Sequence, residues 1–100
     1  MEISGQIGTN PQTKELEEGI EKQTERALKI IKEILESEGW NLGDVIKTRI
    51  YLTDMKDYVR MNEVYSKYFS KDYPTRIALA VKELPKGALI EIDCTATSDK

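Results

Sequence analysis

The feature that most constrains the fold is a hydrophobic period that changes from strand-like to helical and back along the chain. In this 100-residue sequence, the stretch from Glu17 to Glu38 repeats apolar residues at spacings of three, four and seven, which predicts an amphipathic helix. Gly39 follows it as a stop signal. A helix with one apolar face must bury that face against another layer. The apolar stripe consists of Ile20, Ala27, Leu28, Ile31, Ile34 and Leu35.

Shorter runs with a period of two predict strands at residues 2–7, 45–52, 75–82 and 88–96. Between the second and third strands we expect another helix, from the N-cap Asp54 to about Phe69. The element order β-α-β-α-β-β predicts an α+β fold in which two helices cover one face of a mostly antiparallel sheet. One hundred residues predict a single domain, residues 1–100. The stripe of the second helix is Tyr58, Met61, Val64 or Tyr65, and Tyr68.

Alternation along each strand predicts which side chains face the helices. We expect the rows Ile77/Leu79/Val81 and Ile90/Ile92/Cys94 to lie under the helices, and Ile46 to share a face with Thr48, Ile50 and Leu52. The opposite face then mixes alanine with charged side chains. Such a face is either solvent-exposed or covered by partner subunits, and both readings stay open. The charged residues expected there are Lys47, Arg49, Arg76, Glu91 and Asp93.

Arg76 and Glu91 are the candidate site residues. A guanidinium and a carboxylate on one face of a small sheet point to a site for an anionic small molecule. If the last two strands form a tight hairpin centred near Pro85-Lys86, the two residues lie about 13 Å apart along the strands. We therefore expect Arg76 of one chain to face Glu91 of a neighbour. The structural alternatives are a salt bridge from Arg76 to Asp93 or Glu91, and an exposed or paired carboxylate at Glu91.

Composition excludes several classes of site. The chain has no histidine and one cysteine, Cys94, so zinc sites and Ser-His or Cys-His catalysis are excluded, and Cys94 is expected to be a small buried hydrophobe. A net charge of −3 with interspersed signs disfavours nucleic acid as a partner. No apolar stretch approaches the roughly 18 residues that span a bilayer, so no membrane partner is expected. A lone cysteine and the absence of a signal-peptide pattern suit a cytoplasmic location.

A series of ordered blocks gives the chain a resemblance to the Rid proteins (reactive intermediate deaminases, YjgF-like) from about Ser4 to Ala96. The blocks combine polar turn chemistry with strand segments in a fixed order. They are Ser4-Gly5-Gln6-Ile7, Asn10-Pro11, Gln23-Thr24, Gly43-Asp44-Val45-Ile46-Lys47-Thr48, Tyr51-Leu52-Thr53-Asp54-Met55, Asn62-Glu63-Val64-Tyr65, Tyr73-Pro74-Thr75-Arg76, Leu84-Pro85-Lys86 and Ile90-Glu91-Ile92-Asp93.

The resemblance implies a chorismate-mutase-like α+β fold assembled as a homotrimer, with ligand clefts between subunits. It also implies cofactor-free hydrolysis of enamine and imine intermediates, such as 2-aminoacrylate, to 2-keto acids and ammonia. By position, Arg76 matches the arginine that grips the substrate carboxylate, and Glu91 matches the acid near the attacking water. Cleft-lining positions of the family fall on Ser4, Gly5, Asn62 and Ala78, the last through its backbone.

Two departures accompany the resemblance. The family normally begins with a Gly-Pro-Tyr segment whose tyrosine reaches the cleft, whereas this chain starts later, at Met1, so we expect it to be either truncated or lacking that segment. Ala78 replaces a cysteine common in the family, which a backbone contact would tolerate. An alternative function is therefore a non-catalytic protein that binds 2-keto acids through Arg76. A third, ribonuclease or translation-inhibitor activity, is disfavoured by the acidic balance and the absence of histidine.

Overall fold

The computed structural model describes residues 1–69 and 74–97. Its strands are β1 (Glu2–Ile7), β2 (Val45–Leu52), β3 (Thr75–Ala80) and β4 (Ile90–Ala96), and its helices are α1 (Gly19–Ser37) and α2 (Tyr58–Tyr68). The order β-α-β-α-β-β is therefore confirmed. Asp54 accepts a hydrogen bond from the Lys56 amide at 3.0 Å, which caps the 3₁₀ turn Met55–Asp57 that leads into α2.

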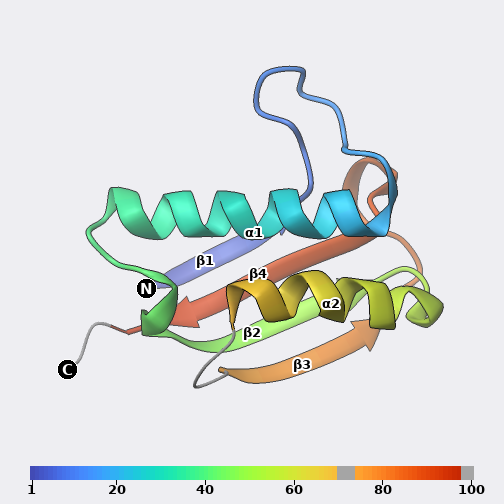
Figure 1. The fold of residues 1–100 in the computed structure, drawn as a ribbon. Coiled ribbons are helices and arrows are strands. Elements are labelled where there is room, and N and C mark those ends of the chain that lie inside the picture. Colours follow the sequence, from blue (N-terminus) through green and yellow to red (C-terminus); the bar gives the residue numbers. More distant parts are fainter. Residues whose placement is uncertain (70–73, 98–100) are drawn as a thin grey trace.

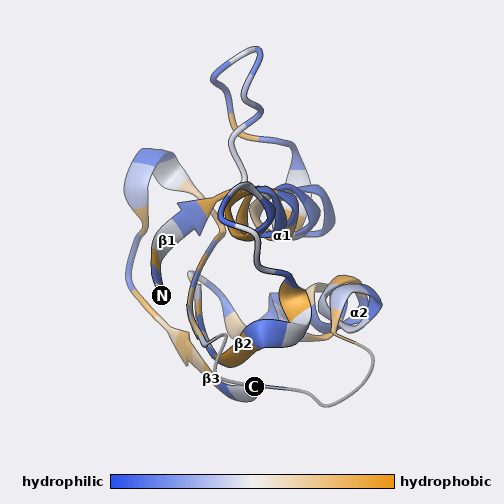
Figure 2. Cartoon of the chain, turned by 90° about the vertical axis from the view of Figure 1, so that its left-hand side faces the viewer, coloured by the Kyte–Doolittle hydropathy of each residue, from blue (hydrophilic) through white to orange (hydrophobic). Residues whose placement is uncertain are grey.

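The four strands form one sheet in the order β1-β4-β2-β3. β4 runs antiparallel to both of its neighbours, whereas β2 and β3 are parallel and are connected through α2. Both helices lie on the same side of this sheet (Figures 1 and 2). The predicted α+β architecture with two helices on one face is confirmed, and the sheet is mixed.

The predicted hairpin between the last two strands is wrong. β4 is inserted between β1 and β2, so that Glu91 lies between Ile7 and Tyr51, while Arg76 pairs with Thr48 at the edge of the sheet. The reason is burial. Ile90 and Ile92 of β4 have no exposed surface, so this strand takes a central place, whereas β3 is left at the edge.

This placement also reverses the predicted faces of β3. Thr48 is buried under the helices, and its in-register partner Arg76 therefore faces the helices too. Ile77 and Leu79, which were expected in the core, are 41% and 50% exposed on the other face. The expectation for Ile90, Ile92 and Cys94 is confirmed, because all three are fully buried.

A second correction concerns the start of β2. The register against β4 shifts between Val45 and Lys47, which is a β-bulge. The extra residue interrupts the alternation, so Val45 is buried and Ile46 is 51% exposed. The predicted row of Ile46 with Thr48 is therefore wrong, whereas the row from Thr48 to Leu52 holds.

The core lies between the sheet and the two helices. α1 contributes the predicted stripe, with Ile34 only partly buried, and α2 contributes Met61, Val64 and Tyr65. Cys94 is buried as expected, and burial raises the pKa of its thiol to about 11. None of the described helices is both long enough and apolar enough to cross a bilayer.

Candidate functional site

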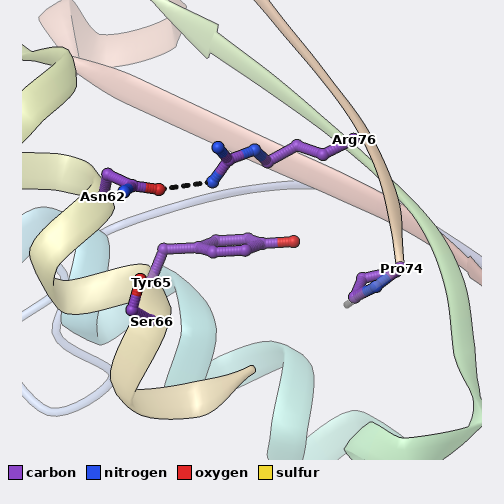
Figure 3. Close-up of a pocket in the computed structure, with 5 residues that line it drawn as sticks. All are labelled: Asn62, Tyr65, Ser66, Pro74 and Arg76. Carbon is purple, nitrogen blue, oxygen red and sulfur yellow. Dashed lines mark hydrogen bonds between the residues drawn. The ribbon is translucent and has the colours of Figure 1, made fainter. Parts of the chain in front are cut away.

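A cleft of about 300 Å³ opens between α2 and the beginning of β3 (Figure 3). The helix supplies Asn62, Tyr65 and Ser66, and the strand side supplies Pro74 and Arg76. Arg76 reaches into this cleft because its register with Thr48 turns it toward the helices. The cleft is therefore built by the same parallel pairing that overturned the sequence prediction for β3.

The Arg76 guanidinium is held by three side chains of α2. Its Nη1 donates to Oδ1 of Asn62 at 2.5 Å, and its Nη2 donates to the hydroxyl of Tyr58 at 2.6 Å. Its central carbon lies 4.8 Å from the centre of the Tyr65 ring, within the range of a cation–π contact. These three residues are spaced four and three apart, which places them on one face of the helix.

Tyr65 is itself fixed from below. Its hydroxyl and Oγ1 of Thr48 form a hydrogen bond of 2.8 Å, and both side chains are buried. Burial raises the pKa of Tyr65, which keeps the hydroxyl neutral. Because Thr48 is also the strand partner of Arg76, the aromatic floor of the cleft and the guanidinium above it are held by adjacent backbone positions.

The charge of Arg76 has no carboxylate partner among residues 1–69 and 74–97. Both of its hydrogen-bond acceptors are neutral, and within one chain it makes no salt bridge to Asp93 or Glu91. A half-buried cation with neutral neighbours attracts an anion, because burial lowers the dielectric screening of its charge. The cleft is therefore suited to an acidic ligand.

Glu91 lies on the opposite face of the sheet, which corrects the prediction that it shares a face with Arg76. It lies beside β1, where the register shifts between Ile3 and Gln6. A methyl group added at Gly5 would collide with the Glu91 carboxylate, so the two residues are in close contact. Ser4, the neighbour of Gly5, is exposed at the same irregularity.

The predicted residues therefore fall into two groups. Arg76 and Asn62 meet in the cleft, whereas Glu91, Gly5 and Ser4 gather on the other side of the sheet. Ala78 shares the helix-facing row with Arg76 but packs against the core and does not line the cleft.

The sequence did not indicate Tyr58, Tyr65 or Ser66 as site residues. Tyr58 and Tyr65 were assigned to the apolar core stripe of the second helix. Tyr65 does belong to the core as well, because it is only 1% exposed. The signal that could have identified the two tyrosines is their helical spacing from Asn62, which is a polar residue among apolar ones on the same helix face.

A polar network surrounds Glu91 without including it. Asp93 forms an ion pair with Arg49 and accepts a hydrogen bond from the Tyr51 hydroxyl at 3.3 Å. Arg49 also contacts Glu2 at 3.1 Å. The hydrogen bond to Asp93 raises the pKa of Arg49. Burial, and to a smaller extent the negative charge of Asp93, raises the pKa of the Tyr51 hydroxyl. In the described part of the chain the Glu91 carboxylate has neither a hydrogen bond nor an ion pair.

The described residues contain no group of three or more His, Cys, Asp or Glu side chains close enough to hold a metal ion. The polar groups of the described residues at the candidate site are the hydrogen-bond donors of the cleft and the Glu91 carboxylate across the sheet.

Comparison with known proteins supports the resemblance seen in the motifs. Residues 1–98 match the family described as Endoribonuclease L-PSP. A RutC family protein of Pyrococcus horikoshii is 50% identical over 95 residues, which cover 94% of this chain and 75% of the relative. The human 2-iminobutanoate/2-iminopropanoate deaminase is 41% identical over 95 residues, which cover 94% of this chain and 69% of the human protein.

The fold agrees as well. The crystal structure of E. coli TdcF with bound serine superposes with a TM-score of 0.94 at 36% identity, covering 98% of this chain and 80% of TdcF. With the family match over residues 1–98, these similarities show that the chain belongs to the Rid/YjgF/RutC (endoribonuclease L-PSP) family.

Proposed function

We propose that this protein is a deaminase that hydrolyses reactive enamine and imine intermediates of the 2-aminoacrylate type to 2-keto acids and ammonia, without a cofactor. The observation that carries the proposal is the half-buried guanidinium of Arg76, which has only neutral partners among the described residues. Imino acids carry a carboxylate that such a group can bind. The human relative is named for deaminating 2-imino acids, and TdcF was crystallised with a small amino acid.

Arg76 would bind the substrate carboxylate. Arginine has five N–H donors, and Asn62 and Tyr58 engage two of those of Arg76. The planar guanidinium can therefore still offer two parallel donors to a carboxylate, a charge-assisted arrangement stronger than a neutral hydrogen bond. The amide nitrogen of Asn62 lies on the same side of the cleft and can assist.

Glu91 would activate the water. The water oxygen bonds to the imine carbon while Glu91 accepts a water proton and passes it to the nitrogen. The resulting carbinolamine then collapses: the hydroxyl proton passes through Glu91 to the nitrogen, the C=O bond forms, and the C–N bond breaks to release ammonia and the keto acid. Ser4 and Gly5 would line the space beside this carboxylate.

The sheet separates Arg76 from Glu91 within one chain, so one small substrate can contact both only if they come from different subunits. We therefore place the site between subunits of a homotrimer. The exposed Ile77 and Leu79 support this arrangement, because burying them against a partner removes apolar surface from water. We place the protein in the cytoplasm, where its unpaired Cys94 suits a reducing environment.

The test generates 2-aminoacrylate or 2-iminobutanoate in situ and follows its disappearance. We expect the wild type to accelerate the decay, Arg76→Ala to raise KM about tenfold or more because a charge-assisted contact is lost, and Glu91→Gln to lower kcat about 10²-fold or more. Arg60→Ala is the matched control, because Arg60 is an exposed arginine of α2, the helix beside the cleft, and does not line the cleft itself. No acceleration by the wild type, or full activity of Arg76→Ala, would refute the assignment.

A second candidate function is a non-catalytic sensor of 2-keto acids. It is favoured by one observation: the described lining of the Arg76 cleft comes from one side of the sheet of a single chain, whereas Glu91 lies across the sheet. Calorimetric binding of 2-oxobutanoate by a wild type that does not hydrolyse the imine would establish the sensor and exclude the enzyme.

A further inference from the structure

We propose that Tyr58 is a carboxylate-binding residue, whose hydroxyl donates a hydrogen bond to the same anionic group that Arg76 grips. This inference rests on the proposed function and concerns the substrate site of that function. The groups around the guanidinium have more hydrogen-bond donors than the described residues use.

The Tyr58 hydroxyl oxygen accepts a hydrogen bond from Nη2 of Arg76 at 2.6 Å. A phenol has one proton to donate as well, and arginine offers no acceptor for it. Among residues 1–69 and 74–97, no side chain or carbonyl accepts that proton. Within the described residues the hydroxyl is thus a donor without a partner, and it lies against a guanidinium whose remaining N–H groups make no hydrogen bond to those residues.

Asn62 repeats the arrangement one turn along α2. Its Oδ1 accepts from Nη1 of Arg76 at 2.5 Å, which leaves the two protons of its amide nitrogen for another acceptor. Tyr58 and Asn62 therefore both bind the arginine through their oxygens. The O–H group of Tyr58 and the NH₂ group of Asn62 remain available as donors to a ligand. A set made only of donors fits a group made only of acceptors, which a carboxylate is and a protonated amine is not.

The contact with Arg76 also strengthens Tyr58 as a donor. A hydroxyl that accepts a hydrogen bond from a cation is polarised, and hydrogen bonds in such a chain reinforce one another at low dielectric. A carboxylate bound by Arg76 lies close to the Tyr58 hydroxyl, since that oxygen is itself in contact with the guanidinium. Tyr58 then adds a third donor to the two of the arginine.

Tyr68 provides a matched control in the same helix. Its hydroxyl donates to Oε2 of Glu25 at 3.0 Å, and burial together with this bond raises its pKa to about 12. Neither tyrosine is among the residues that line the cleft, and the difference between them is that Tyr58 contacts Arg76 whereas Tyr68 contacts Glu25. Removing its hydroxyl makes the same chemical change as removing that of Tyr58, without altering the surroundings of Arg76.

The first experiment measures the dissociation constant of 2-oxobutanoate by calorimetry for the wild type, Tyr58→Phe and Tyr68→Phe. We expect Tyr58→Phe to bind about tenfold more weakly, the usual effect of losing one hydrogen bond to a charged group, and Tyr68→Phe to bind like the wild type. Equal affinities for the wild type and Tyr58→Phe, or the same loss in both variants, would overturn the inference.

A second measurement separates direct donation from the mere holding of Arg76. Incorporating 3-fluorotyrosine at position 58 makes the hydroxyl a stronger donor and a weaker acceptor, at a pH that keeps it protonated. Direct donation predicts tighter binding of 2-oxobutanoate, whereas a role limited to accepting from Arg76 predicts weaker or unchanged binding and would refute the proposal.

These outcomes are independent of the deaminase assay. A wild type that binds 2-oxobutanoate but hydrolyses no imine would exclude the proposed enzyme, and the affinities would still decide the role of Tyr58. A wild type with no affinity for 2-oxobutanoate would overturn the role of Tyr58 itself.

Discussion

Gly5 is the residue that gives the Glu91 carboxylate its space. An added methyl group would collide with the end of that flexible side chain and not with backbone, so Gly5→Ala should displace Glu91 while leaving the fold intact. We expect Gly5→Ala to keep the urea midpoint of the wild type and to lower kcat for imine hydrolysis about as much as Glu91→Gln does.

Gly8→Ala is the contrasting control for this prediction. A methyl group at Gly8 would meet the backbone of Gln23 in α1, which cannot rotate away. We expect this substitution to lower the free energy of unfolding by about 1–3 kcal/mol, as overpacking usually does. If Gly5→Ala were fully active, Glu91 would not depend on this space.

For single residues, the sequence predicted the chemistry of the candidate site better than it predicted where the side chains lie. It singled out Arg76 and Glu91, and motif resemblance added Asn62 and Gly5. It assigned Arg76 to the wrong face of the sheet. The alternation of side chains divides the residues of a strand into two rows, but it does not determine which row faces the core. The aliphatic Ile77 and Leu79 looked like core residues and are exposed instead.

The contact between β2 and α2 depends on the buried pair of Thr48 and Tyr65, whose hydroxyls satisfy each other. Thr48→Val leaves the Tyr65 hydroxyl without a partner, so we expect a loss of about 1–3 kcal/mol in the free energy of unfolding. In the double variant with Tyr65→Phe, no buried polar group is left unpaired, and most of that loss should be recovered.

Urea denaturation of the two single variants and the double variant forms a double-mutant cycle that checks this prediction. Additive losses in the double variant would show that the hydroxyl pair makes no specific contribution to the contact between the strand and the helix.

Elements could be predicted well because their signals are local. Helical spacing placed α1, and period-two runs placed all four strands within a few residues. Their neighbours in the sheet could not be predicted, since β3 pairs with β2 and β4 lies between β1 and β2. The bulge that exposes Ile46 was also missed, because an extra residue in one strand is defined only against its partner.

For the molecule as a whole, the open face of the sheet leads to a prediction about assembly. Leu79 is 50% exposed there, and a lysine at this position would bring a charge into any subunit interface that covers it. We expect Leu79→Lys to shift the proposed trimer to a monomer in analytical ultracentrifugation, and to abolish the proposed imine hydrolysis because Arg76 and Glu91 of neighbouring subunits would no longer meet.

The control for assembly is Val59→Lys, which alters an exposed apolar residue of α2 on the other side of the molecule. It should leave both the sedimentation and the activity unchanged. A wild type that is monomeric at micromolar concentration and fully active would contradict the intersubunit site.

By itself the sequence determined the succession of helices and strands, the absence of histidine chemistry and the residue types of the proposed site. These are properties of short windows of chain, where hydrophobic period and side-chain chemistry suffice. Only the tertiary structure decided the strand order, and with it the placement of Arg76 under α2 and of Glu91 on the opposite face. The reason is that pairing between distant strands is chosen by the burial of the whole sheet, which no single segment encodes.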